Sequence, residues 1–273
     1  MQRYQRLPLY AMVAALGLAT LATPVPAAGN PTVETPQEQQ AYPHATAFLL
    51  RRAGRDTVVH GSDMARMAQT PASSFKPLLA LIALQTGALA AADEILPWDG
   101  TRYPNQPQWH RDMALAEAMR TSSESYFRTL ARRIGREQLA AWVARVGYGN
   151  GQIGERADAA WHQGALRITA HQQLDFIDRL RSGDLPFDRQ HIDSVKRTML
   201  SVDADGVRIY GKTGTSLPPG QPGLGWWIGW VERAGEQTSF VLQAELLQFD
   251  GREQRIAHAN ALLIEAGVLD QLP

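Results

Sequence analysis

The spacing of apolar residues changes twice along this chain, and this change constrains the fold more than any other feature. Residues 46–60 contain two short runs of apolar and β-branched residues around a glycine-containing turn, which predicts two strands. Apolar residues then recur every three to four positions, which is typical of helices. The predicted helical segments are 78–90, 113–134 and 137–146, with Thr169 and Asp188 as candidate N-caps of two more helices.

The last third of the chain returns to the strand pattern. Runs of β-branched and aromatic residues, separated by turn residues, predict strands at 207–213, 225–232 and 239–247. Residues 253–266 then predict a closing helix. The expected fold class is therefore α/β of the α+β type. We expect an antiparallel β-sheet formed from both chain ends, flanked by helices, with an inserted helical subdomain.

The first 27 residues are typical of a secretory signal peptide. Arg3 and Arg6 precede an apolar stretch from Leu7 to Leu21, and Ala27 is a small residue at a suitable cleavage point. The stretch is too short and too interrupted to span a bilayer comfortably, although a retained amphipathic anchor is the alternative. Residues 28–43 predict a flexible lead-in, and the length of residues 44–273 suits one domain or two closely joined halves.

The composition narrows the environment and the partners. The chain contains no cysteine, so it has neither a disulfide framework nor a lipid-attachment site, and we expect an exported, periplasmic protein without a membrane anchor after cleavage. Without Arg3 and Arg6 it carries 25 basic and 27 acidic residues, with no clustered basic stripe of the kind that nucleic-acid binding needs. The length is compatible with a monomer or a homodimer.

Lysine is rare in this chain, and its placement points to chemistry. Only three of the 27 basic residues are lysines, and two of them, Lys76 and Lys212, stand in short motifs that carry serine or threonine. Arginine keeps its proton in proteins, whereas a buried lysine can lose its proton and act as a base. The two motif lysines are therefore candidate functional residues.

Ser73 precedes Lys76 by three positions at the start of an apolar helical segment. Residues three apart on a helix share a face, so the hydroxyl and the amine can meet in one cleft. A serine hydroxyl is a poor nucleophile until a base takes its proton, and burial can lower a lysine pKa enough for that task. The alternative is that Ser73 simply caps the helix.

Lys212 begins a Lys-Thr-Gly-Thr run at the end of a predicted strand, where side chains can face a cleft and Gly214 would let a ligand approach closely. The segment 206–213 also satisfies the phosphate-loop pattern as a string. A phosphate loop needs a flexible stretch followed by a helix, whereas this segment predicts a strand followed by prolines. We therefore expect no nucleotide site.

Further candidates are individually more typical of structural roles. Ser122 lies among four hydroxyl residues in a predicted helix, where such residues often mark a break. The others are Tyr148-Gly149-Asn150, Trp161, Arg252 and Arg255.

Taken in order, these residues resemble the motifs of the class D serine β-lactamases, the oxacillinase type, within the penicillin-recognising serine enzymes. The matching segments are Pro71–Lys76 against P-A-S-T-F-K, Ser122 against the serine of S-x-V, Tyr148-Gly149-Asn150 against Y-G-N, Trp161 in Trp-His-Gln-Gly, Lys212-Thr213-Gly214, and residues 225–232. The resemblance runs from about residue 46 to the C-terminus. It implies that residues 44–273 form a catalytic domain of this type.

The resemblance implies a serine β-lactamase that opens penicillin-type rings through an acyl-enzyme, without a metal. Ser73 would attack the β-lactam carbonyl, and Ser122 would relay a proton towards the lactam nitrogen. Lys76 would be the general base, and in this family it reacts with CO₂ or bicarbonate to form N6-carboxylysine, which Trp161 would hold through its indole N–H. The backbone N–H groups of Ser73 and Thr215 would bind the oxyanion. The substrate carboxylate would be received by Lys212, Thr213, Gly214, Thr215 and Arg255, with Arg252 as the alternative arginine.

Two residues near Lys76 depart from the family pattern. Glu124 replaces the valine of S-x-V, and His162 follows Trp161 where the family usually carries leucine. Both family residues form an apolar lid over the modified lysine, and a carboxylate there would oppose carboxylation of the amine. Three alternatives follow. Glu124 points away, or it pairs with His162 and leaves a free amine with slow deacylation, or the pair itself activates the deacylating water.

The runner-up function is a penicillin-binding protein of the same fold. Such a protein would form the acyl-enzyme but hydrolyse it slowly, acting as a sensor, a trap or a peptidoglycan peptidase. The stability of the adduct on Ser73 distinguishes the two functions.

Overall fold

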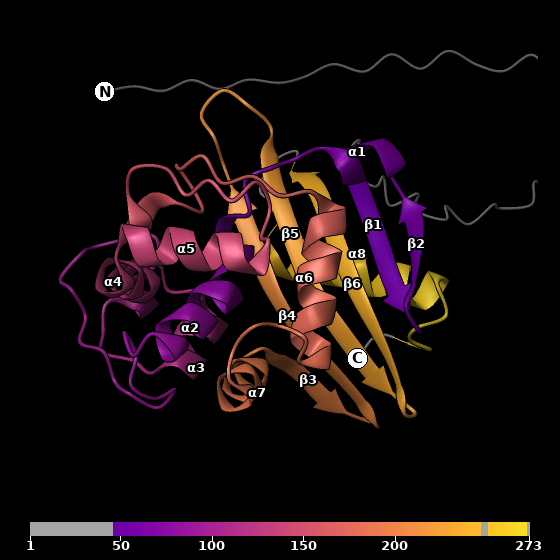
Figure 1. The fold of residues 1–273 in the computed structure, drawn as a ribbon. Helices are drawn as coiled ribbons and strands as arrows, with labels where there is room; N and C mark the ends of the chain where they lie inside the picture. Colours follow the sequence, from indigo (N-terminus) through magenta and orange to yellow (C-terminus); the bar gives the residue numbers. More distant parts are fainter. Residues whose placement is uncertain (1–45, 247–250, 272–273) are drawn as a thin grey trace, which may run out of the picture. The chain divides into compact units, whose positions relative to one another are not determined.

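The computed structural model describes residues 46–246 and 251–271. The predicted signal peptide and lead-in lie outside the described residues. The described chain contains a six-stranded antiparallel sheet in the order β2-β1-β6-β5-β4-β3 (Figure 1). The strands are β1 (Thr46–Arg52), β2 (Arg55–His60), β3 (Leu200–Ala204), β4 (Val207–Ser216), β5 (Gly223–Arg233) and β6 (Glu236–Leu246). Because β1 pairs with β6, both chain ends complete one sheet, and the predicted fold class is confirmed.

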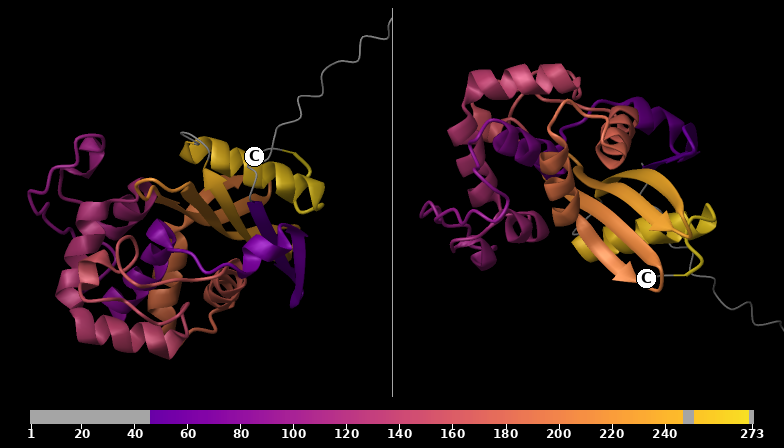
Figure 2. Two further views of the ribbon diagram at one scale, coloured as in Figure 1. Left: turned by 90° about the horizontal axis from the view of Figure 1, so that it is seen from above. Right: turned by 60° about the horizontal axis from the view of Figure 1, so that its bottom comes forward.

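Alternation along the strands gives the sheet two apolar faces. In β1, Phe48 and Leu50 face one cluster of buried residues while Ala47 and Leu49 face another. The first cluster is completed by α8 (Arg252–Glu265). The second is completed by α6 (Ala170–Ser182) and by the helices that pack around α2 (Lys76–Gln85), which we call the helical block. Seen from above, α8 covers one side of the sheet, and α6 and the helical block lie on the other side (Figure 2). Successive side chains of a strand point to opposite faces of the sheet, so one strand can contribute to the apolar cluster on each side.

The helical block is built around α2 (Lys76–Gln85). The first nine residues of α2 are buried, so this helix is enclosed on every side. The other helices are α1 (Ser62–Arg66), α3 (Leu115–Thr121), α4 (Glu124–Ile134), α5 (Arg136–Val146), α6 (Ala170–Ser182) and α7 (Arg189–Thr198), with 3₁₀ turns η1 (Ala72–Phe75), η2 (Pro107–Trp109) and η3 (Ala157–Ala159). Thr169 caps α6 with its side chain in a capping box, as its sequence predicts. Asp188 precedes α7 without a side-chain capping bond.

Two sequence predictions are sharpened by the sheet. Gly206 lies in a turn and residues 207–213 lie in β4. The phosphate-loop string therefore has no helix after its lysine. Strand β3 was not predicted, because Leu200–Ala204 is a short edge strand with mostly exposed residues. Among the described residues, no helix combines the length and the apolar character that crossing a membrane would need.

Candidate active site

Ser73 lies in η1, the 3₁₀ turn that leads directly into α2. Residues three apart align along a 3₁₀ helix, so Ser73 and Lys76 lie on one side of the chain. Ala72 has a φ of 48°, in the left-handed region that residues other than glycine seldom adopt. The Ser74 hydroxyl holds the turn by donating to a backbone carbonyl at 2.6 Å and accepting from Gln173 Nε2 at 2.6 Å. Ser73 makes no capping bond to α2, and it lines the cleft instead.

Gly214 allows β4 to pack against this turn. A Cβ atom at Gly214 would lie 2.9 Å from the Pro71 carbonyl oxygen and 3.0 Å from the Ser74 nitrogen. The prediction that Gly214 makes room for a ligand is therefore corrected, because the turn that carries Ser73 occupies that room. Beyond Tyr210, no strand of the described chain pairs with the outer side of β4. The end of β4 therefore forms an open edge beside Ser73.

The predicted helix over 113–134 breaks at Ser122, whose backbone is left-handed with φ 55° and ψ 40°. Ser123 then caps α4 by accepting a backbone N–H of its first turn at 3.3 Å. The break leaves the Ser122 hydroxyl between two amines, 2.9 Å from Lys212 Nζ and 3.3 Å from Lys76 Nζ. One hydroxyl thus connects the two motif lysines.

Lys76 is completely buried behind the wall of the cleft. Its Nζ donates to the Ser122 carbonyl oxygen at 2.7 Å and lies 3.1 Å from Glu124 Oε2. Burial lowers the pKa of Lys76, and the nearby Glu124 carboxylate opposes that shift without cancelling it. A neutral amine is therefore easier to form here than in water.

Lys212 is also buried, at 3% exposure, but its surroundings differ. Its Nζ donates to the Thr213 carbonyl oxygen and to the Ser122 hydroxyl, each at 2.9 Å. Among the described residues, no carboxylate lies within ion-pair distance of it. Burial lowers the pKa of Lys212 well below its ordinary value, and the positive charges of Lys76 and Arg252 lower it further.

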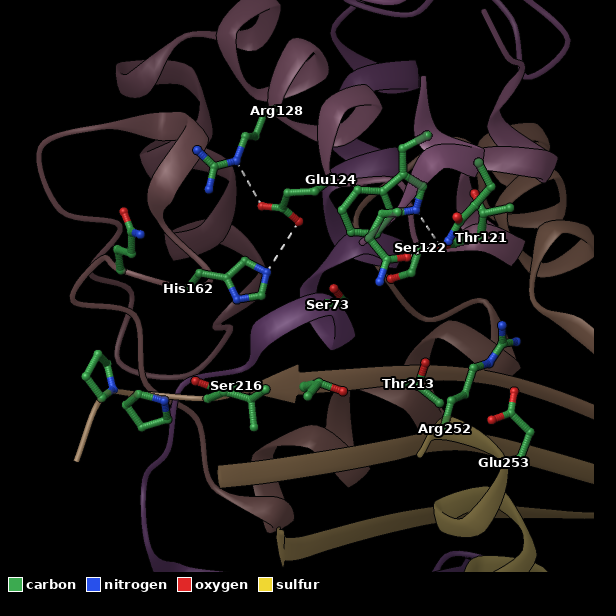
Figure 3. A pocket seen from close by; sticks show the side chains of 18 residues that line it. Ser73, Thr121, Ser122, Glu124, Arg128, His162, Thr213, Ser216, Arg252 and Glu253 are labelled. Atoms are coloured by element: carbon green, nitrogen blue, oxygen red, sulfur yellow. Dashed lines mark hydrogen bonds and ion pairs between the residues drawn. The ribbon is translucent and has the colours of Figure 1, made fainter. Parts of the chain in front are cut away.

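Glu124 is the carboxylate beside Lys76, and several hydrogen-bond donors surround it. Figure 3 shows two of them, Arg128 and His162. Arg128 Nε lies 3.0 Å from Oε1, whereas Trp161 Nε1 and His162 Nε2 each lie 3.3 Å from Oε2. Burial alone would raise the pKa of Glu124, but the charge of Lys76 and the hydrogen bond from His162 outweigh burial and hold it far below its ordinary value. Glu124 is therefore ionised.

These contacts remove one of the three alternatives for Glu124. The alternative in which Glu124 points away is wrong, because the break at Ser122 starts α4 with Glu124 facing Lys76. The pairing of Glu124 with His162, which the other two alternatives share, is present at 3.3 Å, and the same oxygen also contacts Lys76. The indole N–H of Trp161 donates to that oxygen as well.

The Tyr148-Gly149-Asn150 segment anchors the loop that carries Trp161 and His162. The Tyr148 ring contacts the Phe75 ring edge-on at 5.4 Å, and a Cβ at Gly149 would lie 2.2 Å from a backbone carbonyl of that loop. The Asn150 side chain donates to the Ala165 carbonyl oxygen at 2.9 Å. This motif positions the site and does not line the cleft.

The cleft itself has a volume of about 790 Å³. Its walls come from η1, the η2 loop, the break at Ser122, the loop after Trp161, the end of β4 and the start of α8. The predicted residues that line it are Ser73, Ser122, Glu124, His162, Thr213, Thr215 and Arg252.

The two candidate arginines are separated by the structure. Arg252 lines the cleft, whereas Arg255 is 4% exposed and donates from Nη1 to the Gly214 carbonyl oxygen at 2.8 Å. The preference for Arg255 as the residue that meets a ligand directly is therefore corrected in favour of Arg252. Arg255 lies on the side of β4 away from the cleft, and its positive charge acts on Lys212.

The sequence analysis missed several lining residues. Arg128 follows Glu124 by four positions, so the helical i,i+4 rule applied to these two residues would have found it. Trp109 and Leu217 line the cleft from a 3₁₀ turn and from the β4 end, and no motif signals them. In the described part of the chain, no group of three or more His, Asp or Glu side chains forms a candidate metal site.

Comparisons with known proteins agree with this geometry. Residues 35–263 match the model of the penicillin binding protein transpeptidase domain. A probable β-lactamase, YbxI of Bacillus subtilis, is 36% identical over 199 residues, covering 72% of this chain and 73% of that protein. The regulatory protein BlaR1 of Bacillus licheniformis is 33% identical over 201 residues, covering 74% of this chain but only 32% of that protein.

Solved structures give the same result. The crystal structure of a class D β-lactamase from Nostoc superposes with a TM-score of 0.78 at 31% identity, covering 82% of this chain and 94% of that one. The nucleophile turn, the serine between two lysines and the Lys-Thr-Gly strand thus occur in a chain whose fold and sequence both match one family. The chain belongs to the class D serine β-lactamases, within the penicillin-binding transpeptidase family.

Proposed function

We propose that this protein hydrolyses the β-lactam ring of penicillin-type antibiotics through an acyl-enzyme on Ser73. The observation that carries the proposal is the Ser122 hydroxyl, which contacts the buried amines of Lys76 and Lys212 in the cleft that Ser73 lines. Such a relay can take a proton from a nucleophile and deliver it to a leaving group.

In the acylation step, Ser73 Oγ bonds to the lactam carbonyl carbon and its proton passes to the neutral amine of Lys76. The developing oxyanion would accept from the backbone N–H groups of Ser73 and Thr215. When the C–N bond breaks, the proton reaches the lactam nitrogen through the Ser122 hydroxyl, which is in contact with both lysines. The ring opens and the ester on Ser73 remains.

The substrate carboxylate would bind at the open end of β4. Thr213 and Thr215 line the cleft there, Lys212 is buried beside them, and Arg252 adds a charged side chain from α8. A carboxylate arriving at Lys212 would favour the protonated amine, because opposite charges stabilise one another.

Deacylation needs a base for the attacking water. In the family pattern this base is N6-carboxylysine, formed from CO₂ or bicarbonate on the lysine that corresponds to Lys76. The lowered pKa of the buried amine supports this reaction, whereas the ionised Glu124 at 3.1 Å opposes it.

The decisive experiment is mass spectrometry of the purified protein mixed with benzylpenicillin and followed over time. A transient adduct on Ser73 with ring-opened product supports the lactamase function, and the Ser73→Ala variant should form neither. If the wild type forms no adduct, the proposed function is wrong.

A second candidate is a penicillin-binding protein that deacylates slowly. The similarity to a regulatory protein over three quarters of this chain favours keeping it. In the same experiment, this candidate requires an adduct that persists without product release.

We also propose export to the periplasm as a monomer or homodimer, on the basis of the signal-like pattern of residues 1–27. N-terminal sequencing of protein from a periplasmic extract should begin at Ala28. Light scattering of the same material gives the oligomeric state.

A further inference from the structure

Glu124 holds an unusual position for a negative charge, since it is 6% exposed at the edge of a reactive cleft. Its Oε2 atom lies between the amine of Lys76, the indole N–H of Trp161 and the imidazole of His162. Its other oxygen contacts Arg128. A buried carboxylate with this many donors is fixed in place and remains ionised.

This arrangement opposes modification of Lys76. A carboxylated lysine would add a second negative group within contact distance of Glu124 Oε2, which is 3.1 Å from Nζ. Two like charges at that distance in a buried site disfavour one another strongly. The indole N–H that could hold such a group already donates to Glu124. These contacts therefore favour an unmodified amine at Lys76.

His162 provides a base in another position. Its Nε2 atom contacts Glu124, and the side chain, 25% exposed, lines the same cleft as Ser73. Figure 3 shows the second ring nitrogen turned away from Glu124. Within the described residues, no hydrogen bond is made by that nitrogen. A carboxylate that holds one imidazole nitrogen leaves the other able to accept a proton, and it stabilises the imidazolium that results.

We propose that His162, oriented by Glu124, is the general base of deacylation, and that Lys76 acts as an uncarboxylated amine. This inference rests on the proposed function, because it assigns the base for the acyl-enzyme on Ser73. His162 is then a catalytic residue, and Glu124 is a positioning residue that acts through it.

The step balances without any co-reactant other than water. The water oxygen bonds to the ester carbonyl carbon while one water proton passes to His162 Nδ1. The tetrahedral intermediate then collapses, the bond from carbon to Ser73 Oγ breaks, and the imidazolium proton returns to that oxygen. The products are free serine and a ring-opened acid.

Charged side chains surround His162. Glu124 faces the ring from α4 with Arg128 on its far oxygen, and Lys76 of α2 contacts the same carboxylate. Across the cleft, α8 contributes Arg252 and Glu253. The imidazolium formed during the step therefore lies beside the Glu124 carboxylate.

The test measures the two steps separately. Pre-steady-state mass spectrometry with benzylpenicillin follows formation and decay of the Ser73 adduct in the wild type, His162→Leu and Glu124→Gln. We expect His162→Leu to acylate within about threefold of the wild-type rate and to deacylate about 10²–10⁴-fold more slowly. Glu124→Gln keeps the shape of the side chain and should also slow decay. His171→Gln, on α6 outside the cleft, is the matched histidine control.

The state of Lys76 is read independently by ¹³C NMR with labelled bicarbonate. We expect no carbamate signal and no bicarbonate dependence of deacylation in the wild type. Glu124→Val removes the charge, so it should permit a carbamate signal and bicarbonate-dependent decay.

Two results would overturn the inference: a carbamate on Lys76 of the wild type, or an unchanged decay rate in His162→Leu. Both differ from failure of the proposed function, in which the wild type forms no adduct at all.

Discussion

Lys76 and Lys212 are the same side chain in two different electrostatic environments. Both are buried, and both contact the Ser122 hydroxyl. Lys76 lies 3.1 Å from a carboxylate, whereas among the described residues Lys212 donates only to a carbonyl and a hydroxyl oxygen. A buried charge without a counter-ion is costly, so the protein relieves that cost at Lys212 by lowering its pKa well below the ordinary value.

The difference shows that motif position does not define a lysine's charge state. The Glu124 carboxylate opposes the lowering of the Lys76 pKa, whereas the neighbours of Lys212 favour a neutral amine until an anion arrives. We therefore expect the loss of Lys76 to destabilise the fold more than the loss of Lys212.

The largest effect is expected for Lys76→Met. This change removes the base for Ser73 and leaves Glu124 buried without its closest cation on that side. Acylation should fall about 10²–10⁴-fold, and the free energy of unfolding by about 3 kcal/mol, because an uncompensated buried charge remains. Adduct formation by mass spectrometry and urea unfolding measure the two losses.

The double variant Lys76→Met with Glu124→Val serves as the control for this experiment. Removing both charges should recover most of the stability but not the acylation rate. A Lys76→Met protein as stable as the wild type would mean that the ion pair carries no net energy.

A smaller effect on stability, seen mainly in its pH dependence, is expected for Lys212→Met. The folded-state pKa of Lys212 lies below the unfolded value of about 10.4, so between the two values the unfolded chain binds the extra proton. Stability should therefore rise with pH across that window and be lost as pH falls through the lowered pKa. Lys76 contributes with the same sign, since its pKa is also lowered.

Urea midpoints measured from neutral to alkaline pH test this prediction. The pH slope should flatten in Lys212→Met, and stability near neutrality should change by no more than about 1 kcal/mol, because an unpaired buried amine is replaced by an apolar group of similar size. An unchanged slope would show that Lys212 stays protonated in the folded protein.

Much of this site could be predicted from the sequence because its key residues stand in local motifs. Ser73, Lys76 and Lys212 depend on a turn and a strand end, which local spacing encodes. Strands β1, β2, β4, β5 and β6 were predicted because each is a run rich in apolar, β-branched or aromatic residues bounded by turn residues.

The contacts of Glu124 could not be predicted because they depend on tertiary structure. Lys76 comes from α2, and Trp161 and His162 come from the loop that follows α5. Whether these side chains converge depends on the left-handed turn at Ser122, which directs the start of α4. Arg255 was similarly misjudged, because alignment of positions along the chain cannot tell which side of β4 a guanidinium reaches.

The smallest effect is expected for Arg252→Gln, because the two lysines have different arginine neighbours. The charges of Arg252 and Arg255 lower the pKa of Lys212, whereas the arginine that acts on Lys76 is Arg128. Arg252→Gln should therefore reduce the dependence of stability on pH that comes from Lys212. It should leave the acylation rate that depends on Lys76 unchanged. Because Arg252 lines the cleft, the change should also raise KM for benzylpenicillin about threefold to tenfold, the effect of about 1 kcal/mol, with little change in kcat.

Arg255→Gln is the matched comparison for that variant. It removes a similar charge but also the bond to the Gly214 carbonyl behind β4, so its loss should appear more in the unfolding midpoint than in KM. If Arg255→Gln raised KM more than Arg252→Gln, the substrate carboxylate would be bound from behind the strand, and the division of roles between the two arginines would be reversed. In either case the response of Lys212, and not that of Lys76, reports the charge at this end of the cleft.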